Sequence, residues 1–178
     1  MNNLSLLLPE ILVVILGFVI LTIDFFIPKN RRWVLPYMAI LGLAGIFIFS
    51  FIFLLGKSDD LYGGIIRIDG YSLFFKSTFL ILGGVLIASS VEYVNKNLSN
   101  PGEYYSILSI LSFGLFLMVS AIDILMVYLA IEIVSIMSFF LAGYLKKNPH
   151  SNEASVSYTH LRAHETRHDI VCRLLLEK

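Results

Sequence analysis

Long apolar runs separated by short polar breaks make up most of the first 145 residues of the chain. A helix needs about 20 mostly apolar residues to cross the roughly 30 Å hydrocarbon core of a bilayer. Five runs come close to this length, so the pattern predicts an all-α, polytopic membrane protein with five transmembrane helices. We expect these helices near residues 6–27, 34–55, 71–91, 104–120 and 122–145.

The breaks between the runs carry the turn and charge signals of aqueous loops. The first contains Pro28, the second extends from Gly56 to Gly70, and the third contains Asn100-Pro101-Gly102. Only a tight turn near 121–123 separates the last two runs, which predicts that the fourth and fifth helices are antiparallel neighbours. Two pairs of small residues predict close helix packing: Gly42 with Gly45, and Gly84 with Ala88.

The distribution of Lys and Arg predicts the orientation in the membrane, because cytoplasmic loops are enriched in both. The breaks on one side hold Lys29, Arg31, Arg32, Lys96, Lys146 and Lys147, and those on the other side hold Lys57 and Arg67. We therefore expect a multi-pass protein of the cell inner (plasma) membrane with its N-terminus outside.

Composition supports a membrane protein. The chain is 57% hydrophobic and 15% charged, whereas a soluble domain is about 45–50% apolar and about 25% charged. The formal net charge is zero, so the lipid bilayer, and not a nucleic acid, is the expected partner. Cys172 is the single cysteine of the sequence, which excludes an internal disulfide and a paired-cysteine metal motif.

The last 23 residues, 156–178, differ in character from the apolar runs. His164-Glu165-Thr166-Arg167-His168 matches H-E-x-x-H, which on a helix would supply two zinc ligands and a general base. However, Val156–Thr166, and again the residues from Val171 onward, match the codon-by-codon translation of a transposase-type sequencing adapter. We therefore interpret residues 156–178 as an adapter-derived tail, exclude it from the fold, and take residues 1–155 as the transmembrane region.

Glu132 is the clearest ionisable residue within a predicted helix. It lies ten residues after Ile122, about 15 Å along the helix and close to mid-membrane. An acidic residue there costs about 2.5–3.5 kcal/mol on insertion scales and normally faces a bundle interior. Tyr128 and Ser135 share its helix face and could hydrogen-bond the carboxyl or hold a water beside it. We interpret Glu132 as a proton-transfer residue; the alternative is a protonated, structural glutamate.

The other charged residues of the predicted helices have simpler explanations. Glu10 follows Pro9, as expected of a helix start. Asp24 lies at an interfacial helix end, and Asp123 is expected to cap the fifth helix. Lys76 lies near one end of the third helix, where snorkelling to the interface explains it, although it could also respond to a buried charge.

Three segments resemble a known family. They are Leu7-Leu8-Pro9-Glu10-Ile11-Leu12, Asp69-Gly70-Tyr71-Ser72-Leu73-Phe74-Phe75-Lys76, and the run from Asp123 to Ser135 that leads into Gly143-Tyr144. Their order and spacing resemble subunit N of the proton-pumping NADH:quinone oxidoreductase, respiratory complex I. The resemblance covers residues 1 to about 155, roughly the N-terminal third of a family member with fourteen transmembrane helices.

The resemblance implies a membrane-arm subunit of an enzyme, a translocase, that takes part in proton translocation coupled to quinone reduction. Glu132 matches the family's membrane-embedded acid, which pairs with a lysine on a later helix. This type of subunit binds no cofactor, since NADH, flavin, iron–sulfur clusters and quinone belong elsewhere in the complex. Its implied partners are the other membrane subunits and, indirectly, the quinone pool. The fragment alone is expected to be inactive.

Two alternatives remain at this point. A subunit of the multisubunit cation/proton antiporters would share the helices and the acid but would lack redox coupling. Leu8-Pro9-Glu10 and the aromatic entry to the third helix favour subunit N. A passive membrane anchor would leave Glu132 without a purpose.

Overall fold

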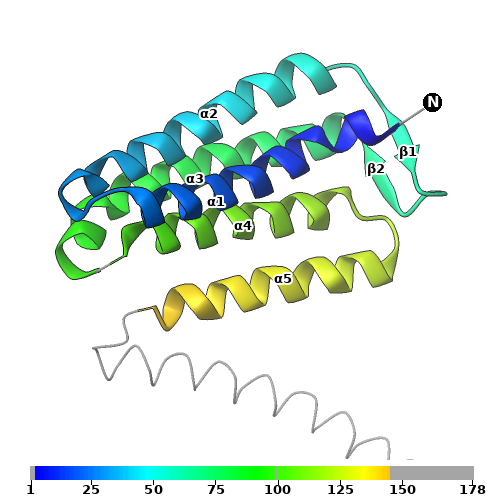
Figure 1. The fold of residues 1–178 in the computed structure, drawn as a ribbon. Helices are drawn as coiled ribbons and strands as arrows, with labels where there is room; N and C mark the ends of the chain where they lie inside the picture. Colours follow the sequence, from blue (N-terminus) through cyan, green and yellow to red (C-terminus); the bar gives the residue numbers. More distant parts are fainter. Residues whose placement is uncertain (1–2, 99, 145–178) are drawn as a thin grey trace, which may run out of the picture. The chain divides into compact units, whose positions relative to one another are not determined.

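The computed structural model describes residues 3–98 and 100–144. They fall into two compact units, residues 1–137 and a second unit of which the structure describes 138–144. The apolar runs form five long helices (Figure 1). They are α1 (Leu8–Phe26), α2 (Leu35–Leu54), α3 (Gly70–Asn97), α4 (Pro101–Ser120) and α5 (Ile124–Ala142). All five are long and apolar enough to cross a membrane, which confirms the predicted fold class.

Local sequence signals explain where the helices begin. Proline occupies one of the first two positions of α1, α2 and α4, where its missing N–H has no cost. Asp69 caps α3 through a capping box in which its side chain accepts a hydrogen bond from the Ser72 N–H. Short 3-10 turns, η1 (Asn3–Leu7) and η2 (Lys29–Val34), precede α1 and α2.

Two helices extend past the predicted limits. We expected the third helix to end near Val91, but α3 continues to Asn97, and α4 begins at Pro101 instead of Tyr104. The added turns are polar. Hydropathy therefore predicted the apolar part of each helix, whereas the helical hydrogen bonds continue into the polar residues that follow or precede it.

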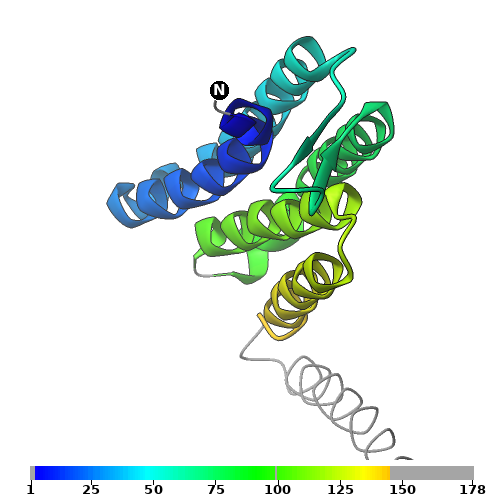
Figure 2. The same ribbon diagram turned by 90° about the vertical axis from the view of Figure 1, so that its right-hand side faces the viewer.

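The first four helices form a ring in which each contacts its chain neighbours. Helix α1 packs against α2 and α4, and α3 also packs against α2 and α4, so α1 and α3 lie across the ring from each other (Figures 1 and 2). Gly17 permits the close approach of α1 to α4, since a Cβ there would lie 3.3 Å from the Ser106 carbonyl oxygen.

The predicted small-residue pairs were partly wrong. Gly42 does pack closely against Leu16 of α1, but Gly45 has open space beside it. Gly84 is also open and Ala88 is exposed, while the neighbouring Gly83 faces α2 and α4. The small residues of α3 therefore contact other helices one position away from the predicted pair.

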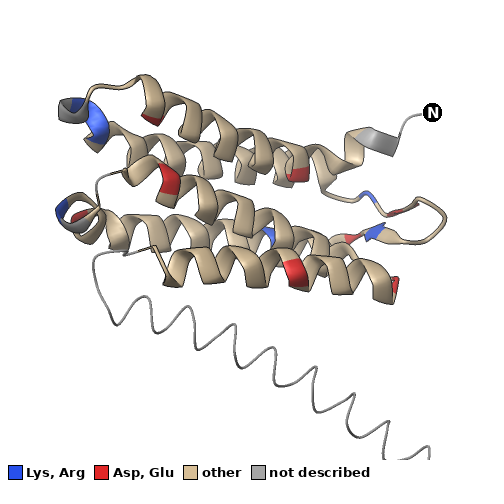
Figure 3. Cartoon of the chain, turned by 60° about the horizontal axis from the view of Figure 1, so that its bottom comes forward, with Lys and Arg blue, Asp and Glu red and all other residues tan. Residues whose placement is uncertain are grey.

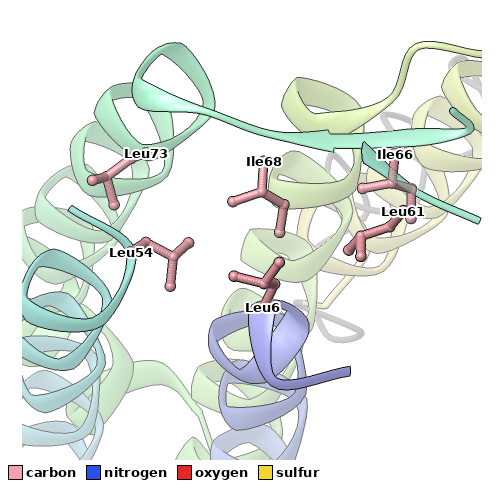
Figure 4. Close-up of a cluster of buried hydrophobic side chains, with 6 residues drawn as sticks. All are labelled: Leu6, Leu54, Leu61, Ile66, Ile68 and Leu73. Carbon is pink, nitrogen blue, oxygen red and sulfur yellow. The ribbon is translucent and has the colours of Figure 1, made fainter. Parts of the chain in front are cut away.

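The connection between α2 and α3 contains a β-hairpin where we expected only an aqueous loop. Strands β1 (Asp59–Leu61) and β2 (Ile66–Ile68) pair antiparallel, with Leu61 opposite Ile66. Their inward side chains join residues from the ends of three other elements in one buried group, which we call the hairpin cluster (Figure 4). The hairpin cluster consists of Leu6, Leu54, Leu61, Ile66, Ile68 and Leu73.

The tight turn before α5 was predicted correctly. Asp123 caps the helix, because its carboxylate accepts a hydrogen bond of 2.7 Å from the Leu125 N–H. The Ile122 N–H donates to the Ile65 carbonyl, which ties the turn to the hairpin. Helix α4 contacts α5 around Gly114, where a Cβ would lie 2.9 Å from Cγ2 of Val134. Among the residues of α5, all of which the structure describes, Ala130 alone is fully buried.

Candidate functional site

Glu132 lies in the middle of α5, as predicted. It is eight residues after Ile124, the first residue of this 19-residue helix, and so about 12 Å along it. Its side chain is partly buried, between the exposed Ile131 and the partly buried Ile133. The position therefore combines mid-helix depth with partial shielding.

The structure limits the hydrogen bonds that the hydroxyls of Tyr128 and Ser135 can make with Glu132. Ser135 donates its hydroxyl proton to the Ile131 carbonyl at 2.7 Å, and a hydroxyl has a single proton to give. Ser135 can therefore accept a hydrogen bond from a carboxylic acid at Glu132 but cannot simultaneously donate a hydrogen bond to a carboxylate there. Tyr128 is 61% exposed, so its ring lies on the outer side of the described helices.

A second pair of ionisable residues lies inside the bundle. The Lys76 ammonium donates to Oε1 of Glu10, with 2.5 Å between nitrogen and oxygen, and the two side chains are 0% and 2% exposed. Lys76 reaches from α3 to α1, which face each other across the helix ring. Glu10 does lie in the first turn of α1 after Pro9, as predicted, and it also pairs with Lys76. The snorkelling of Lys76 was wrong, because the side chain is fully buried, whereas the alternative that it responds to a buried charge is confirmed.

The bundle also contains buried hydroxyls, most of them on α4. Ser109 and Ser112 donate to carbonyls four residues earlier in the same helix, while Ser106 is buried beside them. Among the described residues, several buried oxygens have no hydrogen-bond partner. They are Oε2 of Glu10, Oδ1 of Asp24 and the hydroxyls of Ser50, Tyr105 and Ser120. The apolar bundle thus contains buried polar groups besides the ion pair.

A separate polar cluster lies at the opposite end, at the connections that follow α1 and α3. Asp24 lies in the last turn of α1, at the helix end where it was predicted. It is buried there, 5% exposed, and its Oδ1 lies 3.3 Å from Nε of Arg32. Arg32 donates to Asn100, which in turn donates to Glu103. These side chains line an open pocket of about 550 Å³. Figure 3 shows that charged residues gather mainly near helix ends and connections.

The hairpin carries an exposed ion pair outside the membrane-spanning segments. Arg67 donates two hydrogen bonds to the Asp60 carboxylate, at 2.7 and 3.0 Å. These bonds hold the pKa of Asp60 below its usual range. In the part of the chain that the structure describes, no three His, Cys, Asp or Glu side chains group to hold a metal ion. The H-E-x-x-H motif lies outside the described residues.

Within the described residues, five helices that are long and apolar enough to span a membrane, with a charged pair buried among them, define a polytopic membrane protein. The sequence model of the family described as "NADH:quinone oxidoreductase/Mrp antiporter, TM" matches residues 121–164, which include Glu132. NADH-quinone oxidoreductase subunit N 2 of Chloroherpeton thalassium is 35% identical over 153 residues, 84% of this chain and 30% of that protein. The chain is a homologue of NADH-quinone oxidoreductase subunit N, the family that its motifs resemble.

Other relatives agree. Subunit N of Moorella thermoacetica is 34% identical over 163 residues, 92% of this chain and 34% of the relative. The chloroplastic NAD(P)H-quinone oxidoreductase subunit 2 of Mesostigma viride is 33% identical over 160 residues, 88% and 31% of the two chains. The chain spans about a third of the length of the curated relatives it matches.

The adapter-derived tail, residues 156–178, lies outside the described residues. The family match ends at residue 164, within that segment. The adapter origin and the boundary after residue 155 therefore stay predictions.

Proposed function

We propose that this chain is part of a membrane-arm subunit of a proton-pumping NADH:quinone oxidoreductase, and that it takes part in proton translocation coupled to quinone reduction. The homology to subunit N carries this proposal, together with a glutamate in the middle of a spanning helix. The parent subunit works in the inner (plasma) membrane with its N-terminus outside, in contact with the other membrane subunits. NADH, flavin, iron–sulfur clusters and quinone bind elsewhere in that complex, and the fragment alone is inactive.

Glu132 is the proton-transfer residue of this proposal. A carboxylate at this depth is unfavourable unless a cation lies nearby, and a carboxylic acid is unfavourable once such a cation approaches. The resemblance implies that the cation is a lysine on a helix beyond this chain. Movement of charge in the complex would then make Glu132 take up a proton in one state and release it in the other.

Substitution of Glu132 in the full-length parent subunit, assembled in its complex, tests this role. Glu132→Gln keeps shape and polarity but removes the titratable proton, so proton pumping and the coupled quinone reduction should fall while assembly persists. Glu132→Asp should retain part of the activity, and Glu132→Ala should lose it. Glu92→Gln is the matched control, because Glu92 is an exposed acid near the end of α3, and it should behave as the wild type.

Wild-type pumping by an assembled Glu132→Gln complex would end the proton-transfer role. A glutamate that only holds helices together as a protonated acid predicts that result, because glutamine can donate a similar hydrogen bond.

A second candidate function is cation/proton antiport without redox chemistry, since the matched family description includes the Mrp antiporters. Membranes that contain the full-length parent complex separate the two. Proton uptake driven by NADH oxidation supports the oxidoreductase, whereas cation-driven proton exchange with no NADH-dependent activity supports the antiporter.

A further inference from the structure

We propose that Glu10 and Lys76 form a second intramembrane protonation site, separate from Glu132, through which a proton passes between the two side chains. The inference rests on the proposed function, because it assigns the site to the same proton translocation. Its core is one contact: a lysine and a glutamate from opposite helices of the ring, joined at 2.5 Å and withdrawn from solvent.

The burial of this pair is difficult to explain as reinforcement alone. Removing a carboxylate and an ammonium from water costs several kcal/mol per ion, and apolar side chains of similar volume often stabilise a fold as well or better. A bundle with α1 and α3 across from each other could join them with leucines, as it does in the hairpin cluster. The buried charged pair is therefore better explained by a function of its titratable protons than by stability.

The hairpin cluster separates the pair from the nearer aqueous face. Leu6 precedes Glu10 by four residues and Leu73 precedes Lys76 by three, so each leucine lies about one helical turn closer to the hairpin. Both leucines belong to the cluster, and in Figure 4 Leu6 lies beside Ile68 while Leu73 lies on the side of Leu54. Protons therefore reach the pair through the bundle and not directly from the water beyond the hairpin.

Polar groups lie on the inward side of the pair. Gly17 is seven residues after Glu10, two turns deeper on the same face of α1, and a Cβ there would lie 3.5 Å from Cβ of Ser109 in α4. Gly83 is likewise seven residues after Lys76, and a Cβ there would lie 3.7 Å from Oγ of Ser112. On both helices, the face that carries the charged residue thus meets, two turns further along, the part of α4 that contains the buried Ser109 and Ser112.

Glu10 has the free oxygen that a proton relay requires. Its Oε1 accepts from Lys76, while the buried Oε2 has no hydrogen-bond partner among the described residues. A proton that binds Oε2 makes the carboxyl neutral and removes the counter-charge of the ammonium, which can then release a proton. Transfer of the carboxylic-acid proton to the resulting amine restores carboxylate and ammonium. The balance is one proton in and one proton out, with no other bond changed.

The decisive variant is Lys76→Arg in the full-length subunit, assembled in its complex and reconstituted in vesicles. Arginine keeps the positive charge and the ion pair with Glu10 but does not deprotonate in proteins. We expect an assembled complex whose proton translocation falls by about tenfold or more, a factor that corresponds to about 1.4 kcal/mol of barrier. Protons moved per quinone reduced should fall as well, which a merely structural role does not predict.

A double variant, Glu10→Gln with Lys76→Met, removes both charges without leaving either one unpaired. It should assemble, because the cost of an uncompensated buried charge is avoided, and it should lose translocation to the same extent. The single change Lys76→Met leaves Glu10 charged and alone, so it should reduce assembly. Thr78→Val is the control and should match the wild type, because the Thr78 hydroxyl donates to the Phe74 carbonyl of its own helix and not to the pair.

Wild-type proton translocation by an assembled Lys76→Arg complex, or by the assembled double variant, overturns the proposal and leaves the pair as a structural brace. Failure of both variants to assemble has the same meaning. The tests of the two sites are independent. If the Lys76→Arg complex loses proton translocation while the Glu132→Gln complex pumps normally, only the role of Glu132 is rejected. A wild-type parent without NADH-driven proton uptake rejects the proposed function before any variant is compared.

Discussion

The hairpin cluster makes a quantitative prediction for Ile68→Ala. Ile68 is 0% exposed, and each hairpin strand has only three residues, so backbone pairing alone cannot hold it. Truncation of a buried isoleucine to alanine costs about 2–5 kcal/mol. Because about 1.4 kcal/mol is tenfold in an equilibrium constant, the fraction of molecules with an open hairpin should rise about 30-fold or more.

Hydrogen exchange measured by mass spectrometry on the detergent-solubilised chain reports this opening. The relevant amides are those of Gly64, which donates to Leu61 within the hairpin, and Ile122, which donates to Ile65. Both should exchange faster in Ile68→Ala. Ile65→Ala is the matched control, since Ile65 is 41% exposed and alanine keeps its carbonyl, so its effect should be much smaller. Equal acceleration in the two variants would refute the idea that buried side chains hold the hairpin.

Two further predictions concern close packing and pH. In Gly114→Ala, the new Cβ would lie 2.9 Å from Cγ2 of Val134, so thermal unfolding in detergent should show that the free energy of unfolding falls by about 1–3 kcal/mol. Gly45→Ala is the control, because Gly45 has open space beside it, and its stability should be unchanged or slightly higher. Equal stability of the two variants would contradict the helix contact. Arg67 lowers the pKa of Asp60, so ionised Asp60 stabilises the hairpin above the ordinary aspartate pKa, and that contribution is lost as pH falls through the lowered value. Amide protection in the hairpin should decrease over this acidic range in the wild type but not in Asp60→Asn, and protection that is independent of pH in the wild type would exclude a role for the ion pair.

Local sequence features were sufficient for the helices. Bilayer thickness determines the length of an apolar run, and prolines at helix starts and the Asp123 cap act on neighbouring backbone groups. The prolines and the cap depend on residues within one turn of each other, and an apolar run is continuous in the sequence. For that reason the five helices and the tight turn before α5 could be predicted without knowledge of the packing, and Glu132 could be located at mid-helix.

The hairpin was not predicted, because its stability comes from residues distant in sequence. Its two strands are short, β1 contains two acidic residues, and two glycines lie between the strands, and these features are typical of a loop. The side chains of Leu61, Ile66 and Ile68 become inward only when Leu6 and Leu54 provide a surface to cover them. Packing against other elements thus stabilises the segment between α2 and α3 as a β-hairpin.

Hydropathy and helical periodicity act along the chain, so the sequence alone was enough to predict the five long apolar helices of the described residues and the acid inside the last of them. The pairing of Glu10 with Lys76, 66 residues away, arises only from the packing of the helices. Whether a charge near a helix end meets water, lipid or an opposite charge depends on which helices are neighbours and on how each is rotated. Those properties arise from contacts between elements, and a single helix's sequence does not contain them.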